Sequence, residues 1–325
     1  MASSGNGPGA NVPVICLSAS VPAAIRDLGP AATFAWDEFF SGQLRNKHAK
    51  ASYLRAVRRF LKWLEPTGCP LPRVTPGMIG GYLDSLPLSA TSRKVELAAL
   101  RRFFDVLTLR HVVVLNPALS VRGDRVTVTE GLTPEIKLHQ TRQLLASIDT
   151  TTLLGLRDRA ILACLAFTAA RAGAVARLTR GGLQSDGTHY RLRFHEKNGK
   201  VRDIPVRADL EGYLLAYLTA AGLSDAGPAT PLFRTADGKS GRLTARGLTG
   251  ADVCRLMKRR LAAAGLPTHL SPHSFRVSVA TNLLEQAISL TDVQTLLGHS
   301  DPRTTRLYDR RHREVTRNIV ERIGT

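Results

Sequence analysis

The sequence predicts a mainly α-helical protein with a small β-sheet, an α+β fold divided into two domains. The chain has 325 residues, which is more than one ordinary hydrophobic core holds and about right for two. Apolar residues recur at helical spacing over most of its length. One stretch breaks that pattern. Residues 190–195 alternate polar and apolar side chains, and residues 201–206 follow a turn that contains Asn198-Gly199, which is typical of a β-hairpin.

The composition changes along the chain and sets the domain boundaries. The first residues are rich in Ser, Gly, Pro and Ala and carry little charge, which is typical of a flexible tail. We divide the chain into a tail (1–30), a helical domain (31–119), a linker (120–133) and a second domain (134–325). Thr133-Pro134-Glu135 is expected to begin the first helix of the second domain, because Pro is favoured at the first helical position.

The helical domain has basic outer faces. Residues 49–64 form an amphipathic helix, Thr75-Pro76 begins a shorter one, and a third begins near Ser89 or Thr91. Six cations on these faces are candidate DNA contacts: Arg55, Arg58, Arg59, Lys62, Arg93 and Lys94. Runs of charge usually mark only a solvated helix face, so this prediction depends on the charge of the whole chain.

That charge is +19, which indicates a polyanionic partner. Nucleic acid is favoured over an anionic membrane surface, and no run of about 20 apolar residues is present to span a bilayer. The first residues lack the basic leader of a secretory signal. Four widely separated cysteines suit a reduced protein, so we expect a cytoplasmic location without disulfides or a zinc site.

The segment LSPHSFR in the second domain predicts an anion site. Ser271 is a plausible N-cap and Pro272 the first helical residue, so His273 and Arg276 share one face of the first turns. Helix N-terminal N–H groups and a guanidinium both favour phosphate oxygens. Alternatively, His273 caps the helix and Arg276 pairs with an acid elsewhere.

The segment LLGHSDPRTTRLYDRR places two polar rings nine residues apart. Gly298 is expected to end one helix and Asp301-Pro302 to begin another, with His299 between them and Tyr308 near the end of the second. A tyrosine with a pKa near 10 is a poor nucleophile unless neighbouring cations stabilise its phenolate. The alternative is a partly buried tyrosine on a basic helix.

Four motifs in order resemble the tyrosine recombinase (phage integrase) family, in particular its Xer-like site-specific recombinases. They are TAAR at 168–171, EKNGKVRDIPV at 196–206, HSFR at 273–276 and LLGHSDPRTTRLY at 296–308. The resemblance covers about residues 33–320. It implies an N-terminal core-binding domain that contacts DNA and a C-terminal catalytic domain that cuts and rejoins DNA, for integration, excision or resolution of DNA elements.

The resemblance also implies a role for each motif residue. Tyr308 would attack a phosphodiester and form a 3′-phosphotyrosyl bond, with Arg171 and Arg276 on the non-bridging oxygens. His273 and His299 would bind the phosphate and assist proton movement. Lys197 would protonate the leaving 5′-oxygen, with Lys200 as the reserve candidate. No metal or other cofactor is expected, because no carboxylate cluster suited to Mg²⁺ and no phosphate loop is evident.

Two positions depart from the family pattern, and two alternatives stay open. Ala174 stands where an acidic residue often supports the first arginine, and Val277 stands where a histidine often follows the second. The tail carries an apolar stripe of Val315, Ile319 and Ile323, which is expected to dock onto a neighbouring protomer in a homotetramer or to pack on its own domain. A type IB topoisomerase or a catalytically impaired DNA-binding protein are the alternative functions.

Overall fold

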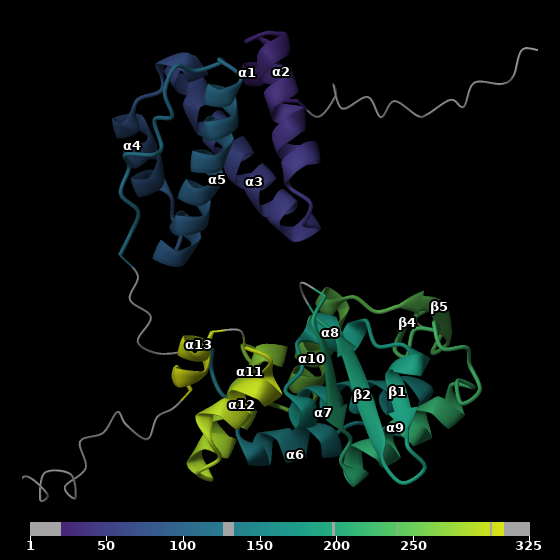
Figure 1. The fold of residues 1–325 in the computed structure, drawn as a ribbon. Helices are drawn as coiled ribbons and strands as arrows, with labels where there is room; N and C mark the ends of the chain where they lie inside the picture. Colours follow the sequence, from purple (N-terminus) through teal and green to yellow (C-terminus); the bar gives the residue numbers. More distant parts are fainter. Residues whose placement is uncertain (1–20, 126–132, 197–198, 239, 300, 309–325) are drawn as a thin grey trace, which may run out of the picture. The chain divides into compact units, whose positions relative to one another are not determined.

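The computed structural model describes residues 21–125, 133–196, 199–238, 240–299 and 301–308. It divides the chain into two compact units, residues 1–127 and 128–325. Helices dominate both units, and the described residues of the second unit also form a three-stranded and a two-stranded sheet (Figure 1). The predicted mainly α fold with a small β component is confirmed. None of the described helices is long and apolar enough to cross a membrane.

The first unit is a helical bundle around an aromatic core. Its helices are α1 (Ala23–Arg26), α2 (Pro30–Asp37), α3 (Lys47–Leu64), α4 (Pro76–Ser85) and α5 (Ala90–Leu109), with a π-helical turn at Glu38–Gln43 and short 3₁₀ turns at Glu65–Thr67 and Leu71–Arg73. Phe39, Phe60 and Phe103 are fully buried at its centre. Thr75 caps α4 and Ser89 caps α5, as the sequence predicts.

The predicted flexible tail is wrong at its last ten residues. Val21 and Ile25 are buried in the core of the first unit, and α1 and the start of α2 lie before residue 31. Apolar side chains spaced four apart bury one face of a short helix, although the surrounding composition is poor in charge and rich in small residues. Residues 1–20 of the predicted tail lie outside the described residues.

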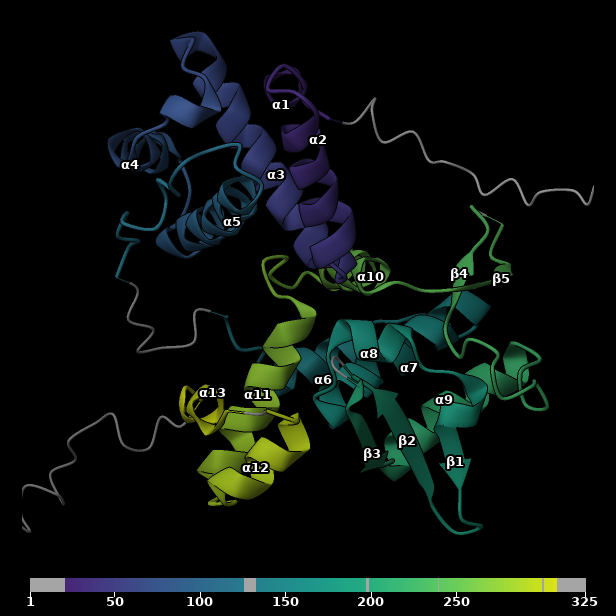
Figure 2. The ribbon, with the colours of Figure 1, turned by 45° about the horizontal axis from the view of Figure 1, so that its top comes forward.

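The second unit is built around α7 (Leu153–Thr168), which packs against helices on every side. The other helices are α6 (Leu138–Ala146), α8 (Ala172–Ala176), α9 (Ala208–Ala220), α10 (Gly250–Ala263), α11 (Pro272–Glu285), α12 (Leu290–Leu297) and α13 (Pro302–Arg306), with a 3₁₀ turn at Arg180–Gly182. Figures 1 and 2 show α11, α12 and α13 grouped together, to the left of the three-stranded sheet in both views. α6 begins five residues later than Thr133, because Ile136 is buried in an extended segment and Lys137 is the N-cap.

The three-stranded sheet contains the predicted hairpin. Strands β2 (Tyr190–His195) and β3 (Val201–Pro205) pair antiparallel from Arg191 opposite Pro205 to His195 opposite Val201. Strand β1 (Leu183–Ser185) pairs with the other edge of β2. The sequence did not predict β1, or the small sheet of β4 (Arg234–Ala236) and β5 (Leu243–Gly247). The register places Glu196, just after β2, at the turn end of the hairpin.

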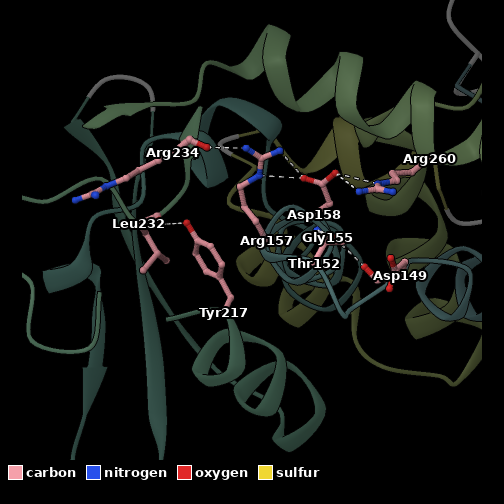
Figure 3. Close-up of polar contacts among 9 residues, drawn as sticks. All are labelled: Asp149, Thr152, Gly155, Arg157, Asp158, Tyr217, Leu232, Arg234 and Arg260. Atoms are coloured by element: carbon pink, nitrogen blue, oxygen red, sulfur yellow. Dashed lines mark hydrogen bonds and ion pairs between the residues drawn. The ribbon is translucent and has the colours of Figure 1, made fainter. Parts of the chain in front are cut away.

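A buried ionic network ties α7 to the rest of the second unit (Figure 3). Asp158, whose side chain is 3% exposed, accepts hydrogen bonds from Arg157 on its own helix and Arg260 on α10. Arg157 also donates to the Arg234 carbonyl of β4 (2.9 Å), and the Tyr217 hydroxyl donates to the Leu232 carbonyl (3.0 Å). Asp158 and all three guanidinium nitrogens of Arg157 have partners, so this network stabilises the packing of α7, α10 and β4.

Candidate active site

Arg276 lies at the centre of the candidate active site, buried in the first turns of α11. The helix begins as predicted, with Ser271 as N-cap and Pro272 at the first helical position. The residue is 1% exposed. It donates through Nη1 to the Ala169 carbonyl (2.8 Å) and through Nη2 to the Leu297 carbonyl. The carbonyls that end α7 and α12 therefore hold this guanidinium in one orientation.

The environment of Arg276 is short of negative charge. Burial, followed by the charges of Arg171 and Arg202, lowers the pKa of Arg276 to about 10. The group still carries its proton at neutral pH. Its Nε is buried and has no hydrogen-bond partner among the described residues. A buried cation with a spare donor is suited to bind an anion such as a phosphate oxygen.

Tyr308 follows α13 and lies within reach of the α11 N-terminus. The residue is 7% exposed and belongs to an apolar cluster with Ala169, Val277 and Leu297. Its hydroxyl oxygen is 3.3 Å from Nε2 of His273. A neutral imidazole can accept the phenol proton at this distance. Val277, one of the two departures from the family pattern, packs here and has no polar role.

The ionisation of Tyr308 differs from the prediction. The sequence suggested that neighbouring cations stabilise the phenolate, and Arg276 and Arg171 do act in that direction. Burial outweighs them, so the pKa of Tyr308 is raised above its usual value. Of the arginines near Tyr308 in sequence, Arg303 and Arg306 are exposed, while Arg310 and Arg311 lie outside the described residues. The phenol is therefore neutral in the free protein.

His299 lies in the turn after α12, where Gly298 ends the helix in the left-handed conformation (φ 63°). Its Nδ1 is 2.9 Å from the Thr305 hydroxyl, and its ring stacks on Tyr308 with the centroids 6.1 Å apart. Burial, followed by the charge of Arg276, lowers the pKa of His299 to about 4. The same two causes lower the pKa of His273. Both rings are therefore neutral at pH 7.

Arg171 is the N-cap of α8 and reaches the same site from the other side. Its side chain is 47% exposed, and its Nη1 donates to Oε2 of Glu196 at 2.9 Å. The other oxygen of Glu196 accepts from Arg202 Nη2, also at 2.9 Å. Neither Glu196 nor Arg202 was among the predicted site residues, because single residues of a hairpin give no periodic signal.

The predicted general acid cannot be placed. Lys197 lies outside the described residues, as do Val315, Ile319 and Ile323 of the predicted docking stripe. Lys200, the reserve candidate, is exposed, and its carbonyl accepts from the Glu196 N–H (2.8 Å) across the end of the hairpin. The structure thus brings together five of the six predicted catalytic residues: Arg171, His273, Arg276, His299 and Tyr308.

The six predicted DNA contacts have unequal surroundings within the first unit. Arg59 pairs with buried Glu96 (2.6 Å), and Arg93 pairs with Asp124 (2.8 Å). Both arginines therefore have intramolecular partners. The other four are exposed on α3 and at the start of α5: Arg55, Arg58, Lys62 and Lys94. Among the described residues, no group of three or more His, Cys, Asp or Glu side chains is placed to hold a metal ion.

The site combines a buried tyrosine hydroxyl, two arginines that can bind phosphate oxygens and two neutral histidines that can accept a proton. These groups are suited to an enzyme that transfers a DNA phosphate to a tyrosine, and comparison with known proteins agrees with this class of enzyme. Residues 135–314 match the phage integrase family, and residues 36–111 match the phage integrase N-terminal SAM-like domain. The chain therefore belongs to the phage integrase family and is a tyrosine recombinase, whose function is site-specific DNA recombination.

Similar curated proteins are Xer recombinases from bacteria. Tyrosine recombinase XerD of Chlorobaculum tepidum is 29% identical over 289 residues, which cover 86% of this chain and 90% of that protein. Tyrosine recombinase XerC of Myxococcus xanthus is 30% identical and covers 80% of this chain and 86% of its own. Tyrosine recombinase XerD of Listeria monocytogenes is 32% identical over 68% of this chain and 71% of its own.

Solved structures share the fold. XerH site-specific recombinase in a post-cleavage complex with its difH substrate superposes with a TM-score of 0.70 at 19% identity and covers 94% of this chain and 93% of its own. A lambda integrase dimer bound to a core site gives a TM-score of 0.63 at 18% identity and covers 87% of this chain and 96% of its own.

Proposed function

We propose that Tyr308 is the nucleophile through which this recombinase opens and reseals DNA strands. Attack of its hydroxyl oxygen on the scissile phosphorus would form a 3′-phosphotyrosyl bond and break the bond to the 5′-oxygen, which leaves as a hydroxyl. Attack by the 5′-hydroxyl of a partner strand reverses these bonds and frees the tyrosine. The main observation in support is that the Tyr308 hydroxyl lies 3.3 Å from Nε2 of His273 and near the charge of buried Arg276.

The remaining groups supply charge and proton transfer. Arg276 has a spare buried Nε, and Arg171 is half exposed, so both can bind non-bridging phosphate oxygens and neutralise charge in the transition state. Neutral His273 can accept the phenol proton, and His299 stacks on the tyrosine ring. The negative charge of a bound phosphate would stabilise the imidazolium that forms when His273 takes this proton. We propose Lys197 as the acid for the leaving 5′-oxygen, with Lys200 as the alternative.

The experiment that tests this proposal traps the covalent link. Fragments of the DNA that flanks the gene are incubated with the purified chain, and covalent complexes are recovered to map the cleavage site. A nicked duplex of that site then accumulates the covalent complex, because the short product strand diffuses away. Tyr308→Phe should form none, whereas the control Tyr213→Phe, which keeps its ring under Arg159, should match the wild type.

Two outcomes contradict the proposal. A covalent complex formed by Tyr308→Phe would show that another residue is the nucleophile. Relaxation of any supercoiled plasmid, with no need for a paired site, would favour a topoisomerase over a recombinase.

The first unit is proposed to hold duplex DNA through the exposed cations of α3 and α5. The charge of +19 supports a polyanionic partner, and these side chains are exposed to solvent, where they can reach phosphates. Because the substrate is cellular DNA, we place the chain in the cytoplasm.

We further propose that the chain assembles as a homotetramer on paired sites. A lambda integrase tetramer bound to a Holliday junction shares the fold, with a TM-score of 0.62 at 18% identity, and supports this assembly.

The second unit carries a groove of about 310 Å³ whose apolar lining includes Leu138, Phe167, Val279 and Leu283. The stripe of Val315, Ile319 and Ile323 from a neighbouring copy is a candidate occupant. Truncation after residue 312 should then leave single-site binding intact and abolish the tetramer, as measured by light scattering.

A further inference from the structure

The first active-site arginine lacks the acidic support expected three residues after it. Ala174 occupies that position and is 3% exposed, packed in the core of the second unit. An unsupported arginine would lose rotamer freedom each time it bound a phosphate, at a cost in free energy. Arg171 is nevertheless held, because Glu196 accepts a hydrogen bond from its Nη1 at 2.9 Å. The carboxylate comes from a residue 25 positions later in the chain.

Glu196 is itself fixed by burial and by a second arginine. Its side chain is 4% exposed, and its Oε1 accepts from Nη2 of Arg202, whose side chain is 12% exposed. Arg202 lies over the Phe194 ring, 5.8 Å from its centroid. Burial lowers the pKa of Arg202, and the charge of Glu196 counteracts this effect. A carboxylate between two guanidiniums and out of water has one favoured position, because any displacement leaves charge unpaired.

The turn that carries His299 passes close to the same carboxylate. A Cβ at Gly298 would lie 3.0 Å from Oε2 of Glu196 and 3.6 Å from Nε of Arg202. The glycine therefore has two reasons to be there, its left-handed backbone and the close approach of this ion pair. Glu196 thus touches three elements of the site: the N-terminus of α8 with Arg171, the β2–β3 hairpin, and the turn before His299.

We propose that Glu196 is a positioning residue that holds Arg171 ready for the scissile phosphate, in place of the acid missing at position 174. This inference rests on the proposed function. Glu196 occupies one of the five donor N–H groups of Arg171, and 47% of that side chain is exposed. The remaining N–H groups of Arg171 can bind a phosphate, and the hydrogen bond to Glu196 already fixes the orientation of the guanidinium. Glu196 also lies among Arg171, Arg202 and Arg276, whose mutual repulsion it reduces before DNA arrives.

The test uses Glu196→Gln in the full chain on the mapped nicked substrate, with saturating DNA and at a temperature where both proteins are folded. Glutamine keeps the side-chain shape and one oxygen, so one arginine loses its acceptor and both lose a counter-charge. We expect the single-turnover rate of covalent cleavage to fall about 10²-fold, because misplacement of a catalytic group has an effect of that size. DNA affinity should stay within a few-fold of the wild type.

The matched control is Asp203→Asn on the same hairpin. Asp203 forms an ion pair of the same kind with Arg193, through two hydrogen bonds of 2.8 and 2.9 Å, and neither residue contacts Arg171. Its loss should leave the cleavage rate unchanged. A fall in rate equal to that of Glu196→Gln would show that any weakened hairpin slows the reaction, and would overturn the proposal.

Two modified substrates distinguish Arg171 from Lys197 as the group that Glu196 serves. A methylphosphonate at the scissile position is neutral and needs less charge neutralisation, so the gap between wild type and Glu196→Gln should shrink on it. A bridging 5′-phosphorothiolate has a leaving group that needs no protonation, so on it the gap should persist. Closure of the gap on the phosphorothiolate alone would assign Glu196 to Lys197 and overturn the role at Arg171.

Two further outcomes are decisive. If wild type forms no covalent complex, the proposed function fails and not this inference. If wild type cleaves and Glu196→Gln cleaves as fast or faster, Glu196 either has no role or blocks the phosphate, and the inference fails.

Discussion

Two buried carboxylates of the second unit each bind two arginines, yet their surroundings differ in one respect. Asp158 and Glu196 have side chains that are 3% and 4% exposed. Around Asp158 most donors are used: Arg157, 4% exposed, donates through all three guanidinium nitrogens, and Arg260 donates to the carboxylate through Nε and Nη2 (Figure 3). Around Glu196 they are not. Arg171 is half exposed, and Nε and Nη1 of Arg202 are buried without a partner among the described residues.

This difference in unpaired donors shows that a buried carboxylate with two arginines can either stabilise the fold or prepare a site for an anion. A fully satisfied network has no donor left for a ligand and contributes only to packing. A network with unpaired donors is less stable by itself, and binding of an anion would satisfy it. Folding free energy is therefore expected to depend on Asp158, and the rate of cleavage on Glu196.

The largest expected effect is at Asp158. Asp158→Asn removes the counter-charge of two arginines that are largely out of water, and should lower the free energy of unfolding by about 3–5 kcal/mol. Chemical denaturation of the full chain measures this, with Asp203→Asn at an exposed ion pair as the control, which should change stability by less than about 1 kcal/mol. Equal losses at the two positions would contradict the special role of the buried network.

The next effect is at Gly155, one turn before Asp158 on α7. A Cβ there would lie 1.7 Å from the Asp149 carbonyl oxygen, a backbone atom that cannot move aside cheaply. Gly155→Ala should therefore destabilise by about 1–3 kcal/mol. Gly212 on α9 is the matched control, because nothing lies within 4 Å of its Cβ position. Gly212→Ala should stabilise by about 0.5–1 kcal/mol, and a loss at Gly212 as large as at Gly155 would show that helical glycines, rather than close packing, matter here.

The active-site region should lose stability in acid. Because the pKa of His299 is lowered to about 4, it stays neutral in the folded chain, whereas in the unfolded chain its pKa returns to about 6.5. The unfolded state then binds more protons between these values, so stability falls as the pH drops from about 6.5 to 4. The lowered pKa of His273 acts in the same direction.

Thermal melts at a series of pH values measure this slope. His299→Gln should make it shallower, whereas His139→Gln, at an exposed position on α6, should leave it unchanged. A His299→Gln slope as steep as the wild type would mean that other groups dominate acid unfolding.

Much of the fold and most of the candidate site could be predicted from the sequence, because both depend on local signals. Helix periodicity, the caps Thr75, Ser89 and Ser271, and the Asn-Gly turn each lie within a few residues. The order of the motifs predicted which residues meet, and the structure brings five of the six together. The apolar content of residues 21–30 was too short a pattern to outweigh their tail-like composition.

What could not be predicted depends on contacts between distant segments. Glu196 meets Arg171 across 25 residues, and Arg276 binds the Ala169 carbonyl across 107. The raised pKa of Tyr308 has the same origin, since burial is a property of the packed cluster and not of the neighbouring arginines in the chain. A charge pattern alone also could not separate Arg59, which serves the fold, from the exposed cations beside it.

The smallest expected effects extend the comparison to a third buried carboxylate, in the first unit. Glu96 is 7% exposed and binds both Arg59 and the Tyr82 hydroxyl (2.9 Å). Arg59 is 42% exposed, so Arg59→Ala should cost about 1 kcal/mol of stability, the upper end for exposed pairs, because Glu96 keeps its tyrosine donor. Lys62→Ala, one turn further along α3, should instead leave the melting temperature unchanged.

DNA binding measured across a range of salt concentrations separates the two residues. If Lys62 contacts a phosphate, its loss should reduce the slope of log affinity against log salt by about 1 and weaken binding equally for all sequences. Arg59→Ala should alter that slope less, because part of its charge is already neutralised by Glu96. A larger change at Arg59 than at Lys62 would mean that an arginine bound to a buried carboxylate still presents its free donors to DNA, as proposed for Arg171 beside Glu196.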